Sequence, residues 1–153
     1  MNFTLRSRTA IAVALLLALA GGSAAAADAQ QEANRKVVLD FYEKGLNQKD
    51  ADAAIALMGN RYVQHNPNAA DGPDGFRKFI GFLKEKFPNS KSEIKRSFVD
   101  GDYVILHVHA VREPGTRGTA IVDIFKLEGG KIVEHWDVAQ PIPENPANNN
   151  GMF

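Results

Sequence analysis

Three stretches of the sequence carry ionisable side chains at positions where a strand-like pattern predicts burial. His107 and His109 lie in one apolar run, and Asp123 lies in the middle of the next. Residues 134–137, Glu-His-Trp-Asp, belong to the run after that. Burying a carboxylate is costly unless it is paired or functional, so enzymes often keep a general base in such a position. We therefore predict that Asp123 is a catalytic acid or base.

The turn between the last two runs predicts which side chains lie beside Asp123. If residues 129–130, Gly-Gly, form a two-residue hairpin turn, Asp123 faces Trp136 across the two strands. Phe125 shares a face with Asp123, because side chains two residues apart on a strand point the same way. Trp136 and Phe125 are therefore predicted to line a substrate pocket. The opposite face would carry two residues with structural roles, His135 and Asp137.

The two histidines of the first run share one face of their strand. Whether His109 lies beside Asp123 depends on the loop at 113–118. A connection with an odd number of residues places His109 there, and an even number places Val108 there instead. We predict that His109 assists Asp123 in acid/base chemistry and that His107 contacts the substrate. The alternative is a pair of structural histidines in a sheet.

His65 and Asn66 form a further candidate. They precede Pro67, which disfavours helix in the residue before it, so we expect them at the end of a short extended segment. That position suits the rim of a pocket, where both side chains would contact a polar group of the substrate. An exposed loop histidine without a function is the alternative.

A metal site is the rival chemistry for the same histidines. His107 and His109 with Asp123, and with or without His65, would make a histidine–carboxylate site, and spacing alone does not decide. No Ser or Cys lies in a recognisable nucleophile motif, and there is no Gly-rich phosphate-binding loop. Covalent hydrolysis and nucleotide binding are therefore disfavoured. We expect neither a metal nor another cofactor.

The periodicity of apolar residues predicts helices in the first half of the chain and strands in the second. Helical spacing indicates helices at 32–46, 50–58 and 75–87, with a short extended segment at 61–65. The strands are expected at 92–99, 103–112, 119–127 and 132–138. This order is typical of an α+β domain. We expect N-terminal helices to wrap a curved antiparallel sheet, as a cone-shaped barrel with a concave pocket.

The N-terminal segment, 1–27, has the layout of a secretory signal peptide. Two arginines precede an apolar run at 11–20, and small residues follow at 24–27. The apolar run is too short to span a bilayer comfortably. Cleavage would leave a domain at 28–140 and an irregular tail at 141–153, periplasmic or secreted and without stable membrane association. An uncleaved membrane anchor is the alternative.

Length and composition bound the remaining possibilities. The chain has 153 residues, a formal net charge of zero and no cysteine. The length suggests one domain, and the balanced charge indicates no nucleic-acid partner. An exported chain without cysteine depends on its apolar core and not on disulfides.

Taken together, these residues resemble the SnoaL-like polyketide cyclase group within the nuclear-transport-factor-two-like cone fold. The resemblance rests on segments 62–67, 107–109, 123–125 and 130–137, and the last of these is fairly specific. It implies an α+β cone with a deep apolar cavity, often as a homodimer. Cyclases of the group perform metal-free intramolecular aldol chemistry with an acidic residue as acid/base. That role maps onto Asp123, with His109 as its neighbour.

The first hypothesis is therefore an exported enzyme with metal-free acid/base chemistry, an aldol-type cyclisation or an isomerisation. Its ligand would be a small apolar molecule with a carbonyl group, and Asp123 would abstract a proton next to that carbonyl. Export is a departure from the polyketide cyclases, which work inside the cell. The alternatives are a non-catalytic ligand-binding protein of the same fold and a metal-dependent enzyme using His107 and His109.

Overall fold

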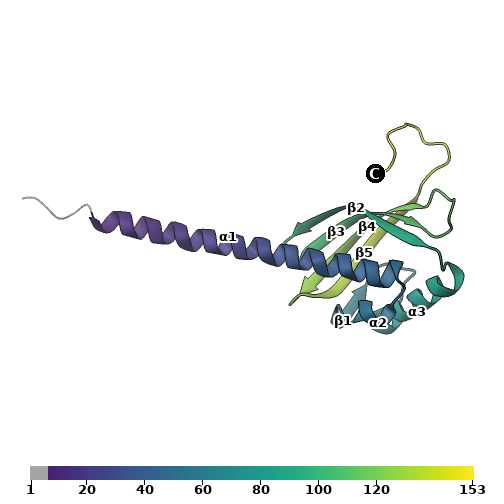
Figure 1. The fold of residues 1–153 in the computed structure, drawn as a ribbon, viewed down its shortest axis with the longest axis horizontal. Coiled ribbons are helices and arrows are strands. Elements are labelled where there is room, and N and C mark those ends of the chain that lie inside the picture. Colours follow the sequence, from purple (N-terminus) through teal and green to yellow (C-terminus); the bar gives the residue numbers. More distant parts are fainter. Residues whose placement is uncertain (1–6) are drawn as a thin grey trace, which may run out of the picture.

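The structure is a computed structural model that describes the backbone of residues 7–153 and the side chains of residues 25–153. Its helices come first and most of its strands follow (Figure 1): α1 (Ser7–Tyr42), η1 (Glu43–Asn47), α2 (Ala51–Ile55), β1 (Met58–Gln64), α3 (Gly72–Lys86), β2 (Lys91–Asp100), β3 (Tyr103–Val111), β4 (Thr119–Glu128) and β5 (Lys131–Pro141). The predicted signal peptide at 1–27 falls almost wholly outside the described side chains. Within the described part of the chain, no helix has the length and apolar character needed to cross a membrane.

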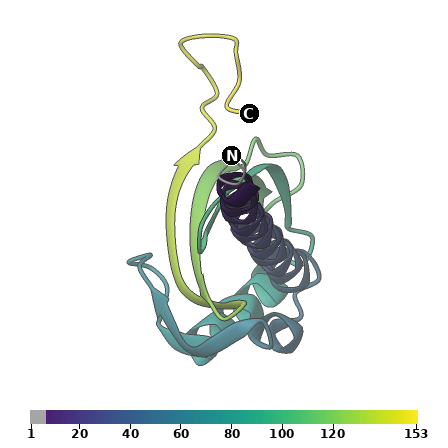
Figure 2. The same ribbon diagram turned by 90° about the vertical axis from the view of Figure 1, so that its left-hand side faces the viewer.

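The five strands form one sheet in the order β1-β5-β4-β3-β2. The pairs β2–β3, β3–β4 and β4–β5 are antiparallel, and β1 pairs with β5 in parallel. The sheet curves around the helices but stays open, with β1 and β2 at its edges (Figure 2). The predicted α+β class, with N-terminal helices against a curved sheet, is confirmed.

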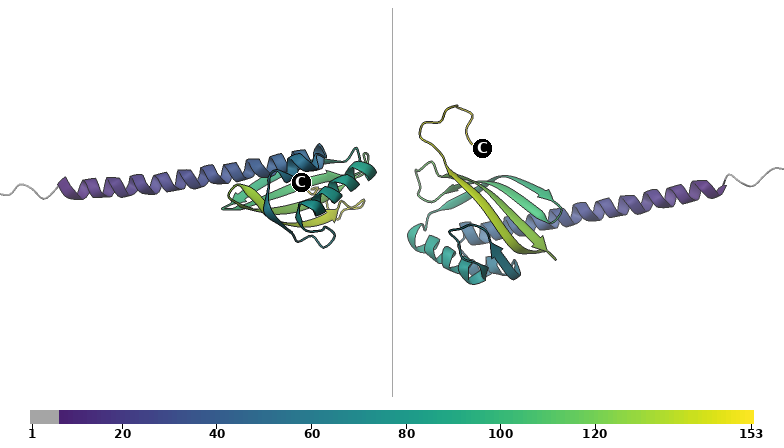
Figure 3. Two further views of the ribbon diagram at one scale, coloured as in Figure 1. Left: turned by 90° about the horizontal axis from the view of Figure 1, so that it is seen from below. Right: turned by 180° about the vertical axis from the view of Figure 1, so that it is seen from behind.

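The core lies between the concave face of the sheet and the helices α1 and α3 (Figure 3). Val38 and Phe41 of α1, and Phe76 and Ile80 of α3, lie three or four residues apart and so occupy one face of each helix. The sheet contributes alternate residues from its central strands, including Val104, Leu106, Val108, Phe125 and Leu127. The polar side chains on this concave face are therefore surrounded by packed apolar groups.

The hairpin between β4 and β5 does not keep the register that its turn predicts. Gly129 and Gly130 adopt φ values of 56° and 74°, which suits a type I′ turn, and Leu127 pairs with Ile132 as expected. One extra residue on β5, Val133, then forms a β-bulge. Beyond the bulge the partner of every β4 residue shifts by one, and the changed pairs are Asp123 with Asp137, Ile124 with Trp136 and Phe125 with His135.

The predicted pairing of Asp123 with Trp136 is therefore wrong. His135 and Asp137 lie on the concave face with Asp123, and Trp136 lies on the convex face. The cause is the bulge, because a one-residue slip moves every following side chain to the other face of a strand.

The connection between β3 and β4 decides the position of the two strand histidines. The last pair is Ala110 with Thr119, which leaves eight residues, 111–118, in the loop. The even-loop alternative is the correct one: Asp123 pairs with Leu106, and Val108 shares its face. His107 and His109 lie on the convex face, so the expected contact between His109 and Asp123 is wrong.

The segment after β5 returns along the convex side of the sheet. The ring of Phe153 lies 5.2 Å from the ring of His107 and 4.8 Å from that of His109, centre to centre. Lys95 Nζ lies 5.5 Å from the same phenyl ring. The described C-terminal residues therefore cover the two histidines from the convex side.

Candidate functional site

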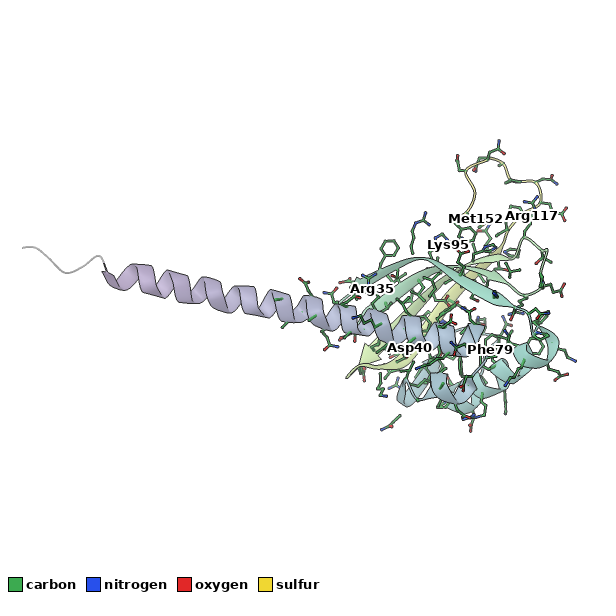
Figure 4. All side chains as sticks on the ribbon, viewed as in Figure 1. Arg35, Asp40, Phe79, Lys95, Arg117 and Met152 are labelled. Carbon is green, nitrogen blue, oxygen red and sulfur yellow. The ribbon has the colours of Figure 1, made fainter. Side chains whose placement is uncertain are left out.

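The concave face, α1 and α3 enclose a cavity of about 760 Å³. Phe41 of α1 and Phe125 of β4 lie in its wall, and α3 contributes Phe79, which Figure 4 labels on the helical side of the molecule. Two carboxyl groups and one imidazole break this apolar wall, those of Asp123, Asp137 and His135. A cavity of this size and lining suits a small, largely apolar molecule that is oriented by a few polar groups.

Asp123 is the most buried acid of this wall, with 4% of its surface exposed. Tyr42 donates its hydroxyl to Oδ2 over 3.0 Å, and His135 Nε2 lies 3.0 Å from Oδ1. Both oxygens of Asp123 therefore have partners, which offsets the cost of burying the carboxyl group.

Gln64 determines which nitrogen of His135 carries a proton. Its Oε1 accepts a hydrogen bond from the backbone N–H of Asn66 over 2.9 Å, which orients the amide. The same oxygen lies 3.0 Å from His135 Nδ1. Because an amide oxygen only accepts, His135 Nδ1 must be the donor and is protonated.

The hydrogen bond between His135 Nε2 and Asp123 Oδ1 then has one proton to share. With Nδ1 protonated, that proton makes either an imidazolium beside a carboxylate or a neutral imidazole beside a carboxylic acid. The two arrangements differ only in the position of this proton. Asp123 can therefore act as a base when the proton is on His135 and as an acid when the proton is on Asp123 itself.

Asp137 lies directly opposite Asp123 on the neighbouring strand. Like charges in that position repel each other. The side-chain amide of Asn66 donates to both oxygens of Asp137, over 2.7 and 2.8 Å. This contact orients Asp137, and the imidazole of His135 lies on the same face two residues away.

Two buried tyrosines complete the polar part of the cavity wall. Burial, followed by the negative charge of Asp123, raises the pKa of Tyr42 well above its ordinary value. Burial and the same charge also raise the pKa of Tyr62. Both phenols therefore remain protonated at neutral pH, and Tyr42 acts as a donor to Asp123.

Asp123, His135 and Asp137 also have the composition of a metal site. Each offers one ligand atom, and these atoms lie within 4.8 Å of one another. The oxygens of Asp137 already accept from Asn66, and those of Asp123 already have Tyr42 and His135 as partners. A cation would have to displace the contact between Asp123 and His135, so this donor set fits a proton better than a metal.

The structure brings only some of the sequence-predicted site residues together. Asp123, Phe125 and Asn66 line the cavity. His65 and Trp136 stack on each other with ring centres 4.5 Å apart and planes 4° apart, and neither belongs to the cavity wall. The convex face carries the other two predicted residues, His107 and His109. The suggested metal set of His107, His109 and Asp123 is therefore not assembled.

The sequence interpretation did not select Tyr42, which contacts Asp123, or Gln64, which contacts His135. It gave His135 and Asp137 structural roles on the opposite face, whereas both lie beside Asp123. The unshifted register would have placed the acid Glu134 opposite Phe125 in the core. The bulge instead pairs Glu134 with Lys126, whose Nζ lies 3.6 Å from Glu134 Oε1. The unfavourable burial of Glu134 in the unshifted register could thus have indicated, from the sequence, that the register between β4 and β5 changes.

Comparisons with solved structures agree with this fold. TsrD from Streptomyces laurentii aligns with a TM-score of 0.60 and 18% identity over 71% of this chain and 89% of its own. A putative SnoaL-like polyketide cyclase from Jannaschia sp. CCS1 gives 0.58 and 21% over 71% and 86%. AclR, a putative hydroxylase from Streptomyces galilaeus, gives 0.60 and 19% over 72% and 90%. At these identities the likeness establishes the fold alone.

No functionally curated protein is significantly similar in sequence. Residues 38–135 match the SnoaL-like domain family. This segment covers most of the chain and contains α3, all of β1 to β4 and the first half of β5. It also contains the buried acid Asp123 and three residues of its hydrogen-bond network, Tyr42, Gln64 and His135. The chain therefore belongs to the SnoaL-like domain family.

Proposed function

We propose that the cavity binds a small molecule with a carbonyl group and catalyses proton transfer next to that carbonyl. The reaction would be an aldol-type cyclisation or an isomerisation without a metal. The observation that carries the proposal is the hydrogen bond between Asp123 and His135 in the cavity wall, with Gln64 holding the second imidazole nitrogen protonated.

In the proposed reaction, the Asp123 carboxylate takes a proton from the carbon beside the carbonyl group. The electrons of that C–H bond form an enolate, which attacks a second carbonyl carbon of the same molecule. Asp123 then gives the proton to the alkoxide oxygen, so the Asp123 carboxylate is regenerated and no other reactant is consumed. His135 and Tyr42 stabilise the carboxylate before the transfer.

One observation favours a second candidate, a non-catalytic ligand-binding protein. Both oxygens of Asp123 have protein partners, and only 4% of the residue is exposed. A buried structural acid has the same properties. Catalysis requires that a ligand in the cavity can reach the Asp123 carboxyl group. Ligand binding alone does not require this access.

Deuterium exchange at the carbon beside the carbonyl of 2-tetralone, followed by NMR in D₂O, distinguishes the two. The protein should accelerate the exchange, and Asp123→Asn should lower that acceleration by roughly 10²- to 10⁴-fold, because it removes the base. Asp102→Asn, the same change in an exposed turn, should leave it unchanged. Asp123→Asn should stay folded, because the amide oxygen can still accept from Tyr42 and the amide nitrogen can donate to the unprotonated Nε2 of His135.

Two other results would contradict the proposal. Loss of stability in Asp123→Asn with unchanged exchange in the folded fraction would make Asp123 a structural residue. A loss of exchange on adding a chelator would favour a metal at Asp123, His135 and Asp137 instead.

We also propose export and self-association. The basic, apolar and small-residue order of segment 1–27 supports a cleaved signal peptide, and α1 extends well beyond the sheet in Figure 1. Exposed apolar side chains on the convex face, Phe98 and Val138, support a homodimer through that face.

A further inference from the structure

The charges of the cavity wall are separated between its floor and its mouth. The acids of the wall, Asp123 and Asp137, lie on the sheet beside His135. Its cations are exposed side chains from three different segments, Lys78 of α3, Lys91 of β2 and Arg112 after β3. None of these three forms an ion pair within residues 25–153, whose side chains the structure describes.

Two of these cations lie close together at the open end of β2 and β3. Lys91 pairs with Val111, and Arg112 is the next residue along the chain. The guanidinium of Arg112 lies over the ring of Phe87, 5.6 Å from its centre, which limits its freedom. Burial and then the charge of Lys91 lower the pKa of Lys49, whose Nζ donates to the carbonyl of Ser90 over 3.0 Å. Positive charge therefore accumulates around Ser90.

Ser90 itself carries an unsatisfied polar atom. The residue is only 7% exposed, lines the cavity and precedes Lys91 directly. Its Oγ has no hydrogen-bond partner among the described residues. A buried hydroxyl without a partner costs free energy, and native structures contain few of them. This Oγ is itself buried, so a ligand atom that accepts a hydrogen bond would satisfy it once the Ser90 side chain rotates toward the cavity that the residue lines.

Apolar side chains lie in the same wall as these polar groups. Phe79 and Phe82 of α3 line the cavity, and Phe82 is 44% exposed. An exposed phenylalanine beside unpaired cations suits a ligand with an apolar body and a charged end.

We propose that the mouth of the cavity is an anion-binding subsite formed by Ser90, Lys91 and Arg112, so that the substrate is an amphipathic anion with a carboxylate, sulfonate or phosphate group. Its anionic end lies at the mouth, and its apolar body extends toward Asp123 and His135. The negative charge of the floor repels the anionic end, so the ligand enters in one orientation. The inference rests on the proposed function only in taking this cavity as the substrate site.

Two fluorescent probes that differ by one sulfonate test this subsite. 1-Anilinonaphthalene-8-sulfonate is anionic, and N-phenyl-1-naphthylamine is its neutral counterpart. The fluorescence of both probes rises in apolar surroundings. The measurement therefore does not depend on the fluorescence of the single tryptophan, which lies on the convex face. The sulfonate should bind the wild-type protein more tightly than the neutral probe.

The variant Lys91→Gln/Arg112→Gln should weaken binding of the sulfonate by about 10-fold and leave the neutral probe within about twofold, because two charge-assisted contacts are lost. Lys36→Gln/Arg117→Gln removes the same charge at exposed positions outside the cavity wall and should change neither affinity. Ser90→Ala should weaken the sulfonate by about 3- to 10-fold. It should not lower the stability of the free protein, because the hydroxyl is unpaired there.

The subsite would be overturned if the wild-type protein bound both probes with equal affinity. It would also be overturned if Lys36→Gln/Arg117→Gln weakened binding of the sulfonate as much as Lys91→Gln/Arg112→Gln does. The proposed catalytic function is judged separately, by exchange in Asp123→Asn. A preference for the sulfonate that persists in Asp123→Asn, with unchanged exchange, would support the subsite and contradict only the catalysis. If Asp123→Asn loses the exchange activity but the wild-type protein shows no preference for the sulfonate probe, only the subsite is contradicted.

Discussion

Replacing Tyr42 with phenylalanine tests the hydrogen-bond network around the buried acid. The change removes one hydroxyl and keeps the ring, which packs edge-on against Phe125 with centres 6.4 Å apart. The lost contact is the 3.0 Å hydrogen bond to Asp123 Oδ2, between two residues that are 5% and 4% exposed. After the change, Oδ2 has no donor among the residues that now contact it.

The expected size of the effect follows from this geometry. A hydrogen bond to a charged group contributes about 1.5–3 kcal/mol, so Tyr42→Phe should lower the free energy of unfolding by about 2 kcal/mol. In urea, this loss moves the unfolding midpoint by about 1 M for a domain of this size. Tyr62→Phe is the matched control, since Tyr62 is as buried as Tyr42 but its hydroxyl has only a 3.4 Å contact from Gln64 Nε2. Its loss should stay below about 1 kcal/mol.

The same comparison in a second background identifies the acceptor. In Asp123→Asn the hydroxyl of Tyr42 meets a neutral amide, so the further loss on Tyr42→Phe should fall to about 1 kcal/mol. Equal losses in Tyr42→Phe and Tyr62→Phe, or an undiminished loss in the Asp123→Asn background, would refute the role of Tyr42 as donor to a charged Asp123.

Three further outcomes are expected. Because the pKa of Tyr42 is higher in the folded than in the unfolded chain, stability should fall as pH rises above about 10, and urea unfolding at pH 9 and 11 should show a smaller fall in Tyr42→Phe. Intact-mass analysis of exported protein should give an N-terminus near Asp28, and a full-length chain would contradict cleavage. Val138 is 73% exposed on the convex face, so Val138→Asp should convert a dimer to a monomer in analytical ultracentrifugation, whereas a monomeric wild type would contradict the dimer.

The sequence was sufficient to predict the order of the helices and strands and the inward position of Asp123. It did not predict that the helix expected at 32–46 begins earlier and ends in the π-helix η1, or that the helix expected at 50–58 ends at Ile55. The alternation of Ile121, Asp123, Phe125 and Leu127 has period two, and the three apolar members can be buried only together. The acid between them must then share their face. This reasoning is local to one strand, and it does not depend on how the neighbouring strands are aligned.

The partners of Asp123 could not be predicted in the same way, because they depend on alignment between distant segments. Tyr42 is 81 residues away from Asp123 in sequence, and its place in the apolar stripe of α1 does not show what its hydroxyl contacts. Gln64 reaches His135 only because β1 pairs with β5 in parallel. The length of the loop between β3 and β4 was not fixed by the sequence, so two registers remained possible. The structure has the register that an even number of loop residues gives.

The bulge at Val133 suggests how the chemistry of this cavity could change during evolution. If the bulge were lost without any change in the length of the chain, β5 would return to the uninterrupted register, turning His135 and Asp137 outward and Glu134 and Trp136 inward. Substitutions that only disfavour the bulge could thus exchange an imidazole for an indole in the wall without any insertion or deletion. Relatives with and without the bulge can therefore share matching letters in a sequence alignment and still present different residues to their substrates.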